Sequence, residues 1–239
     1  MSVADDLWDL EALSHAEGLG DWMFSRLPPA KGARVAEVGA GIGTFSRRLL
    51  DAGARELLLI EPAPQCAARL RARFGDDDRV RVSEDALPDA PALAEWAGSC
   101  DLVVCQNVLE HIVDDRASLV AMAAALRPGG TLALLVPAHP RLFNRLDRRF
   151  GHQRRYSARR LRRLAAEAGL TVERLERFNA LGVVGWLVEG LAPRPAIRPR
   201  ALRLYELAVR PWRRLEDRIR TPLGLSLILH ARRTRAGRS

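Results

Sequence analysis

The fold is decided by the stretch Ala33-Arg34-Val35-Ala36-Glu37-Val38-Gly39-Ala40-Gly41-Ile42-Gly43, which runs directly into Thr44-Phe45-Ser46-Arg47-Arg48-Leu49-Leu50. A short apolar run meets three closely spaced glycines, and apolar residues then resume at helical spacing. This pattern predicts a strand, a tight glycine turn and a helix. Such a turn lets the backbone approach a ligand with no Cβ in the way, at the end of the strand where open α/β sheets bind ligands.

The spacing of the glycines argues against two other classes of ligand site. The dinucleotide fingerprint GxGxxG would need a glycine at position 44, where this chain has Thr44, so the spacing argues against NAD. A phosphate loop would need GK[ST] after the glycines, and the only lysine in the chain is Lys31.

The run from Glu37 to Gly43 resembles the ExGxGxG first motif of class I S-adenosylmethionine-dependent methyltransferases. The next predicted strand, 56–60, ends in Glu61, 22 residues after Gly39. A carboxylate at such a distance can accept hydrogen bonds from both hydroxyls of a ribose. The resemblance implies S-adenosylmethionine as the cofactor, and it implies these binding residues in this part of the chain: Glu37, Gly39, Ala40, Gly41, Gly43, Glu61 and Pro62. The alternative is that the glycines only form a turn and Glu61 is a solvated carboxylate.

Two later segments extend the resemblance to the cofactor. Glu84-Asp85-Ala86-Leu87 follows the third predicted strand and resembles the adenine-binding element of the family. This implies Asp85 as acceptor for the exocyclic amine and Ala86 beside the ring; the alternative is a turn in which Asp85 caps a helix. Gln106-Asn107-Val108-Leu109-Glu110-His111 resembles the fourth motif, which often reads VLEH in the small-molecule branch. It implies that Asn107 lies by the amino-acid end of the cofactor or the transferred methyl.

The segment Gly151-His152-Gln153-Arg154-Arg155-Tyr156-Ser157 resembles a GHxRRYS element of small-molecule and glycan-related methyltransferases. Its position after the fifth strand predicts that it faces the acceptor. We expect His152 as the base, with His111 as second candidate, and Tyr156 to shape the pocket. Ionised arginines on a solvated loop are the alternative reading. Glu110 would gain importance if the acceptor atom were carbon.

Strands alternate with helices over the first 178 residues, which is typical of a parallel sheet with helices on both faces. We predict a single α/β domain, 1–239, with a doubly wound, mostly parallel, seven-stranded sheet of the Rossmann-like methyltransferase fold. Its expected parts are a helical cover (1–30), a cofactor-binding core (31–178), an insertion (179–222), a last strand (223–231) and a disordered tail (232–239).

The insertion 179–222 opens with an apolar segment, Leu181 to Val188, and continues into a basic amphipathic helix that includes Trp212. A long insertion in a compact domain is usually functional. We expect it to form a lid over the acceptor. A dimer interface and a peripheral contact with an anionic membrane surface are the two alternatives, because both would use the same apolar face.

Charge is distributed unevenly along the 239 residues. Residues 1–140 carry 13 basic and 21 acidic side chains (net −8), residues 141–239 carry 25 and 8 (net +17), and the sum is the overall +9. A basic half can attract nucleic acid, but 37 of the 38 basic residues are arginine, which indicates a general compositional bias. The Asn/Asp-Pro-Pro-aromatic tetrad of enzymes that methylate nucleic-acid bases is also absent at positions 106–111. Nucleic acid is therefore an unlikely partner.

The three cysteines show no metal-binding or disulfide spacing, so we expect no metal site. No signal peptide opens the chain and no apolar run is long enough to span a membrane, which favours a cytoplasmic location. The sequence thus predicts a monomeric or homodimeric methyltransferase for a small-molecule acceptor such as a metabolite, a sugar or a lipid-linked compound. An RNA methyltransferase, and a cofactor-binding protein without turnover, are the alternatives.

Overall fold

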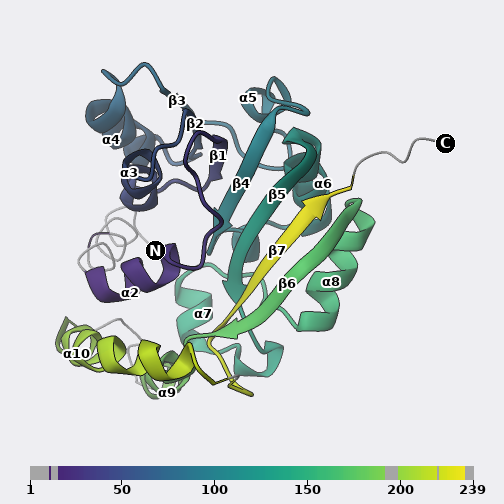
Figure 1. Ribbon diagram of the computed structural model, residues 1–239. Helices are drawn as coiled ribbons and strands as arrows, with labels where there is room; N and C mark the ends of the chain where they lie inside the picture. The colour runs from purple at the N-terminus through teal and green to yellow at the C-terminus, as the bar shows by residue number, and fades with distance from the viewer. Residues whose placement is uncertain (1–10, 12–15, 192–198, 220, 235–239) are drawn as a thin grey trace.

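The computed structural model describes residues 11, 16–191, 199–219 and 221–234, and these form a three-layered α/β structure around one sheet (Figure 1). The sheet has seven strands in the order β3-β2-β1-β4-β5-β7-β6. All strands run parallel except β7, which is antiparallel to both β5 and β6. This confirms the predicted fold class. The strands are β1 (Arg34–Val38), β2 (Glu56–Ile60), β3 (Val80–Ser83), β4 (Cys100–Gln106), β5 (Leu126–Pro137), β6 (Leu170–Phe178) and β7 (Ser226–Arg233).

Helices connect the strands and cover both faces of the sheet (Figure 1). The longer α-helices are α2 (Glu17–Phe24), α3 (Thr44–Asp51), α4 (Pro64–Phe74), α6 (Asp115–Ala125), α8 (Ala158–Glu167), α9 (Ala180–Leu191) and α10 (Pro199–Glu216). The shorter ones are α5 (Pro91–Ala94), α7 (Arg145–Arg149) and two 3-10 turns, η1 (Leu109–His111) and η2 (Pro140–Leu142).

The core lies in two apolar layers, one on each face of the sheet. The layer under α5, α6 and α8 includes Met122, Leu161 and Leu229, and the layer under α3 and α4 includes Leu49 and Leu70. Each central strand contributes alternate side chains to the two layers and is buried on both faces, as parallel strands in α/β proteins are. The apolar run that predicted β1 as a strand is therefore explained by two-sided burial.

The last strand differs from its predicted bounds. β7 spans Ser226–Arg233 instead of 223–231, because Arg232 pairs with Thr131 of β5 and Arg233 pairs with Leu170 of β6. The end of this strand is determined by pairing with residues that are distant in the sequence. The composition near position 232 therefore did not predict where the strand ends. Residues 235–239 of the predicted tail lie outside the described residues, as do residues 1–10 and 12–15 of the predicted helical cover.

The insertion forms α9 and α10, which lie below the sheet next to α2 in Figure 1. Trp22 of α2 and Val209 of α10 share a third apolar cluster with Phe178 of β6. Glu206 of α10 accepts hydrogen bonds from the backbone amides of Gly18 (2.7 Å) and Leu19 (3.0 Å), so α10 is fastened to the first turn of α2. Among the described helices, none combines the length and the apolar character that a bilayer crossing requires.

Candidate active site

The predicted cofactor residues lie in one row at the carboxyl edge of the sheet. Val38 at the end of β1 pairs with Ile60 of β2 and with Cys105 of β4, and Ile60 in turn pairs with Ser83 of β3. The residues that follow these strand ends are therefore neighbours in space, although the chain separates them widely. They are Gly39, Glu61, Asp85 and Asn107.

The backbone angles of the turn and the side chains around it both require glycine at these positions. Gly39, Gly41 and Gly43 all have positive φ angles (73°, 56° and 83°), a conformation that side chains with a Cβ rarely adopt. A Cβ on Gly39 would lie 2.2 Å from Cγ2 of Val108, and a Cβ on Gly43 would lie 2.5 Å from the ring of Phe74. The first glycine thus lets β1 approach the end of β4, and the third lets α3 start against α4.

Glu61 lies against the glycine turn, as the sequence predicts. Its Oε2 accepts a hydrogen bond from the amide of Gly41 (2.8 Å), and its Oε1 accepts one from the amide of Ala63 (3.0 Å). The side chain is buried except for 8% of its surface. A carboxylate has about four acceptor positions, so two remain for donors on a ligand.

Asp85 follows β3, is half-buried, and accepts a hydrogen bond at Oδ2 from the amide of Ala92 (2.7 Å). This is the helix-capping contact that the sequence left open as an alternative, and it leaves Oδ1 for another donor. Ala86 and Pro62 are exposed at the same edge. Asn107 is exposed and has a positive φ of 52°.

Glu37 lies behind the glycine turn, almost completely buried, and its Oε2 accepts a hydrogen bond from the hydroxyl of Ser46 (2.6 Å). Burial raises the pKa of Glu37 to about 8, because loss of hydration disfavours the charged form more than the Ser46 hydrogen bond favours it. The Glu61 carboxylate adds a smaller upward effect.

A second polar cluster lies around His152. Nδ1 of His152 is 2.8 Å from Oδ1 of Asp147, a completely buried carboxyl that also accepts hydrogen bonds from Arg155 Nε (2.8 and 3.0 Å) and the amide of Asn144 (2.9 Å). Burial opposes ionisation of Asp147, but the hydrogen bonds from His152 and Arg155 outweigh it and hold its pKa below the usual value. Since an ionised carboxylate can only accept, Nδ1 donates and Nε2 of the neutral imidazole carries the free lone pair.

Glu110 faces that free nitrogen. Its Oε1 lies 3.9 Å from Nε2 of His152, its side chain is completely buried, and neither carboxyl oxygen has a hydrogen-bond partner among the described residues. Burial raises the pKa of Glu110 to about 8, and the nearby Arg155 lowers it by less. Gln153 donates its amide to the carbonyl of Glu110 (2.7 Å), which ties the His152 loop to the end of β4.

His111 is the second predicted base, and its ring meets the ring of His152 edge-on with centroids 4.8 Å apart. His111 keeps an exposed edge, yet packing around the ring lowers its pKa, since lost hydration and the adjacent His152 both disfavour a positive charge. Ligand atoms of Glu110, His111 and His152 lie within 4.8 Å of one another, so these three residues are close enough to share a metal ion. Our expectation of no metal site was based on the spacing of the cysteines, and this group contains no cysteine.

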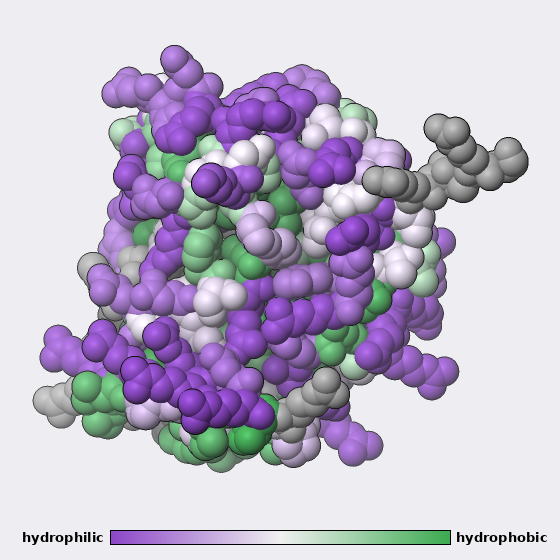
Figure 2. All heavy atoms as spheres, viewed as in Figure 1, coloured by the Kyte–Doolittle hydropathy of each residue, from purple (hydrophilic) through white to green (hydrophobic). Residues whose placement is uncertain are grey.

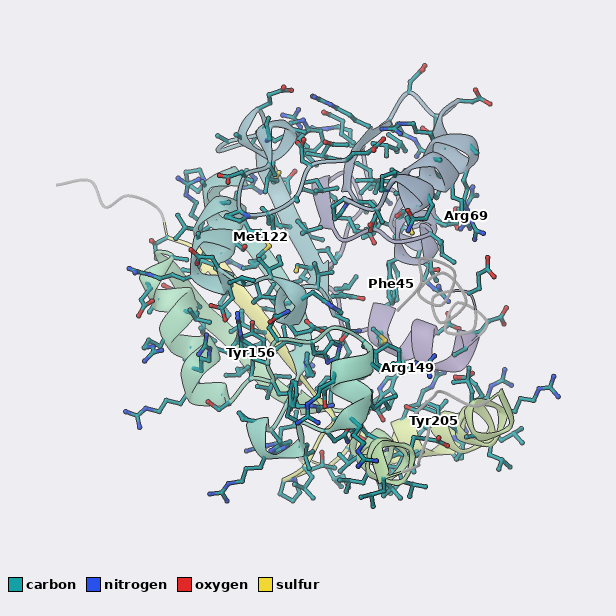
Figure 3. All side chains as sticks on the ribbon, turned by 180° about the vertical axis from the view of Figure 1, so that it is seen from behind. Phe45, Arg69, Met122, Arg149, Tyr156 and Tyr205 are labelled. Atoms are coloured by element: carbon teal, nitrogen blue, oxygen red, sulfur yellow. The ribbon has the colours of Figure 1, made fainter. Side chains whose placement is uncertain are left out.

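Tyr156 has a different position from the one expected of a pocket residue. It is completely buried, and its hydroxyl donates to Asp115 Oδ2 (3.0 Å) and lies 3.2 Å from the carbonyl oxygen of Leu109. Figure 3 shows it within the packed side chains near α8. Arg154 is also occupied, by an ion pair with Asp115 (3.3 Å) and by the carbonyl of Ile112 (2.9 Å). From the sequence alone, a tyrosine or an arginine that packs into the protein cannot be distinguished from one that faces solvent in the same polar loop.

Two residues of this cluster were missed by sequence reasoning. Asp147 has no motif that identifies it as the partner of His152; the only local signal is that it closes a capping box with Asn144 at the start of α7. Trp186 comes from α9 of the insertion and donates its Nε1 to Asp147 Oδ2 (3.3 Å). Its ring is stacked on that of His152, with an interplanar angle of 5° and centroids 6.2 Å apart.

Comparison with known proteins places this geometry in a family. A family model described as "Methyltransferase domain" matches residues 17–175, more than half of the chain. The ubiquinone biosynthesis O-methyltransferase of Xanthomonas axonopodis pv. citri (strain 306) is 40% identical over 119 residues, which are 48% of this chain and 46% of that protein. The enzyme of the same name from Bordetella avium (strain 197N) is 32% identical over 110 residues, 46% of this chain and 45% of that protein. The chain thus spans about half the length of the curated relatives it matches.

Solved structures share the fold over nearly the whole chain. An S-adenosylmethionine-dependent methyltransferase from Mesorhizobium loti has a TM-score of 0.64 at 18% identity and covers 91% of this chain and 100% of its own. Geranyl diphosphate C-methyltransferase from Streptomyces coelicolor A3(2), solved with Mg²⁺, geranyl diphosphate and S-adenosyl-L-homocysteine, has a TM-score of 0.66 at 13% identity and covers 91% of this chain and 77% of its own. The match to the family model, together with the sheet order and the glycine turn, shows that the chain belongs to the methyltransferase domain family, with the fold of the class I S-adenosylmethionine-dependent enzymes.

Proposed function

We propose that this protein is an S-adenosylmethionine-dependent methyltransferase that methylates a hydroxyl group of a small-molecule acceptor. The observation that carries the proposal of an acceptor with a proton to lose is the hydrogen bond between Asp147 and Nδ1 of His152, which leaves Nε2 as a base in the loop after β5. The name of the similar proteins, ubiquinone biosynthesis O-methyltransferase, agrees with methyl transfer to oxygen.

The residues at the carboxyl edge of the sheet fit this cofactor. A ribose carries two hydroxyl donors and adenine carries an amine donor, and Glu61 and Asp85 retain acceptor positions beside the glycine turn. Residues proposed to hold the cofactor are Glu37, Gly39, Ala40, Gly41, Gly43, Glu61, Pro62, Asp85, Ala86 and Asn107. When bound, the cofactor supplies a methyl group on a sulfonium, which is already activated and needs no acid catalyst.

The work left to the protein is to position the acceptor and to remove its proton. Nε2 of His152 would accept the proton of the acceptor hydroxyl as its oxygen bonds to the methyl carbon, and S-adenosyl-L-homocysteine would leave as the carbon–sulfur bond breaks. The Asp147 carboxylate stabilises the resulting imidazolium through Nδ1 and fixes the orientation of the ring. Arg155 stabilises the buried Asp147 carboxylate in turn, at 2.8 Å.

The cofactor edge and the proposed base are connected through one short segment. Val108 packs at Gly39 of the glycine turn, and Glu110, two residues further on, lies 3.9 Å from Nε2 of His152. Trp186 brings the insertion into contact with the same imidazole. These contacts support the proposal that the insertion forms one wall of the acceptor site and acts as its lid.

The proposal is tested by measuring S-adenosyl-L-homocysteine formation with a panel of small hydroxylated acceptors, phenols and catechols among them. We expect His152→Gln to lower kcat by about 10²- to 10⁴-fold, the usual contribution of a general base, while the affinity for S-adenosylmethionine is unchanged. His139→Asn is the matched control, since His139 is half-buried outside this cluster and has a positive φ (58°) that asparagine tolerates. Near wild-type turnover in His152→Gln would remove His152 as the base.

The same assay separates the other functions that the sequence left open. Binding of S-adenosylmethionine with no product formed from any acceptor would indicate a cofactor-binding protein without turnover. Product formed only with RNA, together with a submicromolar and strongly salt-dependent RNA affinity, would indicate an RNA methyltransferase.

A further inference from the structure

The outer surface of α9 and α10 carries an apolar stripe that nothing in the described part of the chain covers. On α9, Val184, Leu187, Val188 and Leu191 recur at three- and four-residue spacing and are exposed, Leu191 by 83%. On α10, Leu204, Leu207 and Leu215 lie on one face of the helix with the exposed Pro211, and Leu207 is 74% exposed. The two helices contact each other. Exposed apolar patches of this kind mark contact surfaces.

The opposite faces of the two helices are the ones that fold against the protein. On α10 these are Tyr205, Val209, Trp212 and Glu216, which again recur at three- and four-residue spacing. Glu216 accepts a hydrogen bond from the backbone amide of Asn179 (2.6 Å), so this face is attached to the protein by polar contacts as well as apolar ones. The outward leucines are therefore not needed to hold α10 in place.

A row of arginines borders the apolar stripe. Arg203, Arg210 and Arg214 are spaced by seven and four residues along α10, and none of them forms an ion pair with another described residue. The acidic residues of the helix point elsewhere, since Glu206 binds the start of α2 and Glu216 is buried. Figure 2 shows hydrophobic side chains gathered along the lower edge of the molecule, over α9 and α10, beneath a row of hydrophilic ones.

We propose that the outer face of α9 and α10 binds an anionic membrane surface, with the apolar stripe in the headgroup boundary and the arginine row on lipid phosphates. Helices with an apolar face bordered by basic residues lie in such interfaces, and neither of these two could cross a bilayer. The charge pattern favours this occupant over a second copy of the chain, because Glu206 and Glu216 both face the protein, so the same face of a second α10 offers the arginine row no carboxylate.

Membrane binding here would place the proposed acceptor site next to the bilayer. Trp186, which stacks on His152, belongs to the same helix as the outward Val184 and Val188. The inference nevertheless stands apart from the proposed reaction, because it concerns the outer surface of the insertion and is tested without turnover.

The test is flotation of the purified chain with vesicles of phosphatidylcholine alone or of equal parts phosphatidylcholine and phosphatidylglycerol. We expect binding to the anionic vesicles and much less to the neutral ones. Val188→Glu should weaken binding about tenfold, because it replaces inserted apolar surface with a charge of the wrong sign. Val113→Glu, the same substitution at a 78% exposed valine that belongs to neither helix, should leave binding unchanged. Arg210→Glu should weaken binding at low salt, and the difference should shrink at high salt.

Three results would overturn the inference. The first is no binding to anionic vesicles, and the second is equal loss of binding in Val188→Glu and Val113→Glu. The third is a concentration-dependent dimer in sedimentation velocity that Val188→Glu converts to monomer, since the stripe would then be a self-interface. Thermal unfolding of each variant checks that the exposed substitutions leave the fold intact.

Discussion

Trp186 and His152 lie with their ring planes 5° apart, although 33 residues separate them in the chain, and both side chains contact the carboxyl group of Asp147. The tryptophan belongs to the insertion between β6 and β7, and the histidine belongs to the loop after β5. A single carboxylate thus holds an indole and an imidazole from two separate segments. The insertion is consequently part of the structure around the proposed base.

Replacing Trp186 tests the lid role of the insertion. We expect Trp186→Ala to raise the KM for the acceptor and to lower kcat, together by about tenfold or more in kcat/KM, because His152 loses the ring packed on it. Trp186→Phe keeps an aromatic ring but loses the hydrogen bond to Asp147, so its effect should be smaller. Steady-state kinetics at saturating cofactor measure both variants, and unchanged parameters in Trp186→Ala would contradict the lid role.

Hydrogen exchange provides a second measure of the insertion. Amides of α9 and α10 should exchange more slowly when an acceptor is bound, because a lid closes over its ligand. Exchange that stays the same with saturating acceptor, while turnover is normal, would show that the insertion does not close on the acceptor.

Glu61 provides the test of the cofactor assignment. Glu61→Ala should weaken S-adenosylmethionine binding by about 1 to 3 kcal/mol, the range for losing hydrogen bonds to a charged group. Asp85→Ala should weaken it too. Glu84→Ala is the control, since Glu84 is the exposed neighbour that pairs with Arg71 on the surface. Isothermal titration calorimetry measures all three, and unchanged affinity in both Glu61→Ala and Asp85→Ala would refute the assignment.

Substitutions at Gly39 test why the first position of the turn is a glycine. Gly39→Ala should destabilise the protein by about 2 kcal/mol or more, because the new Cβ overlaps Val108 and the φ of 73° is strained for alanine. Gly98→Ala has a comparable φ (67°) and open space around the new Cβ, so it should cost only the backbone strain, about 1 kcal/mol. Urea unfolding compares them. The double variant Gly39→Ala/Val108→Ala should recover part of the loss, and equal losses in Gly39→Ala and Gly98→Ala would disprove the steric explanation.

The raised pKa of Glu37 predicts that this side chain makes the stability of the protein depend on pH. Its folded pKa, about 8, lies above the unfolded value near 4.5, so the folded state binds more protons between these values. The contribution of Glu37 to stability should therefore fall as pH rises from about 4.5 to 8, by on the order of a few kcal/mol. Glu37→Gln cannot ionise and should show a shallower fall. Urea unfolding at pH 5.5 and pH 8.5 gives the difference between the two proteins; identical pH dependence would show that Glu37 is not the cause.

The local sequence was sufficient for the fold class and for bringing the proposed cofactor residues to one edge of the sheet. Strand β1, the turn at Gly39 and helix α3 follow one another directly in the chain. The sequence features that predict them, the spacing of apolar residues and the three glycines, each span only a few residues. Glu61 could be placed beside the turn because parallel neighbouring strands bring their carboxyl ends to one edge.

The surroundings of His152 were decided only by the tertiary structure. The sequence singled out His152 and His111, but it did not connect either to Asp147 or Trp186, because these contacts join irregular segments that have no periodicity. It also assigned Tyr156 to a pocket, whereas the structure buries that side chain on Asp115. Whether a polar side chain in a loop turns inward depends on buried partners from elsewhere in the chain, since a buried hydroxyl or carboxyl needs a hydrogen bond that only packing supplies.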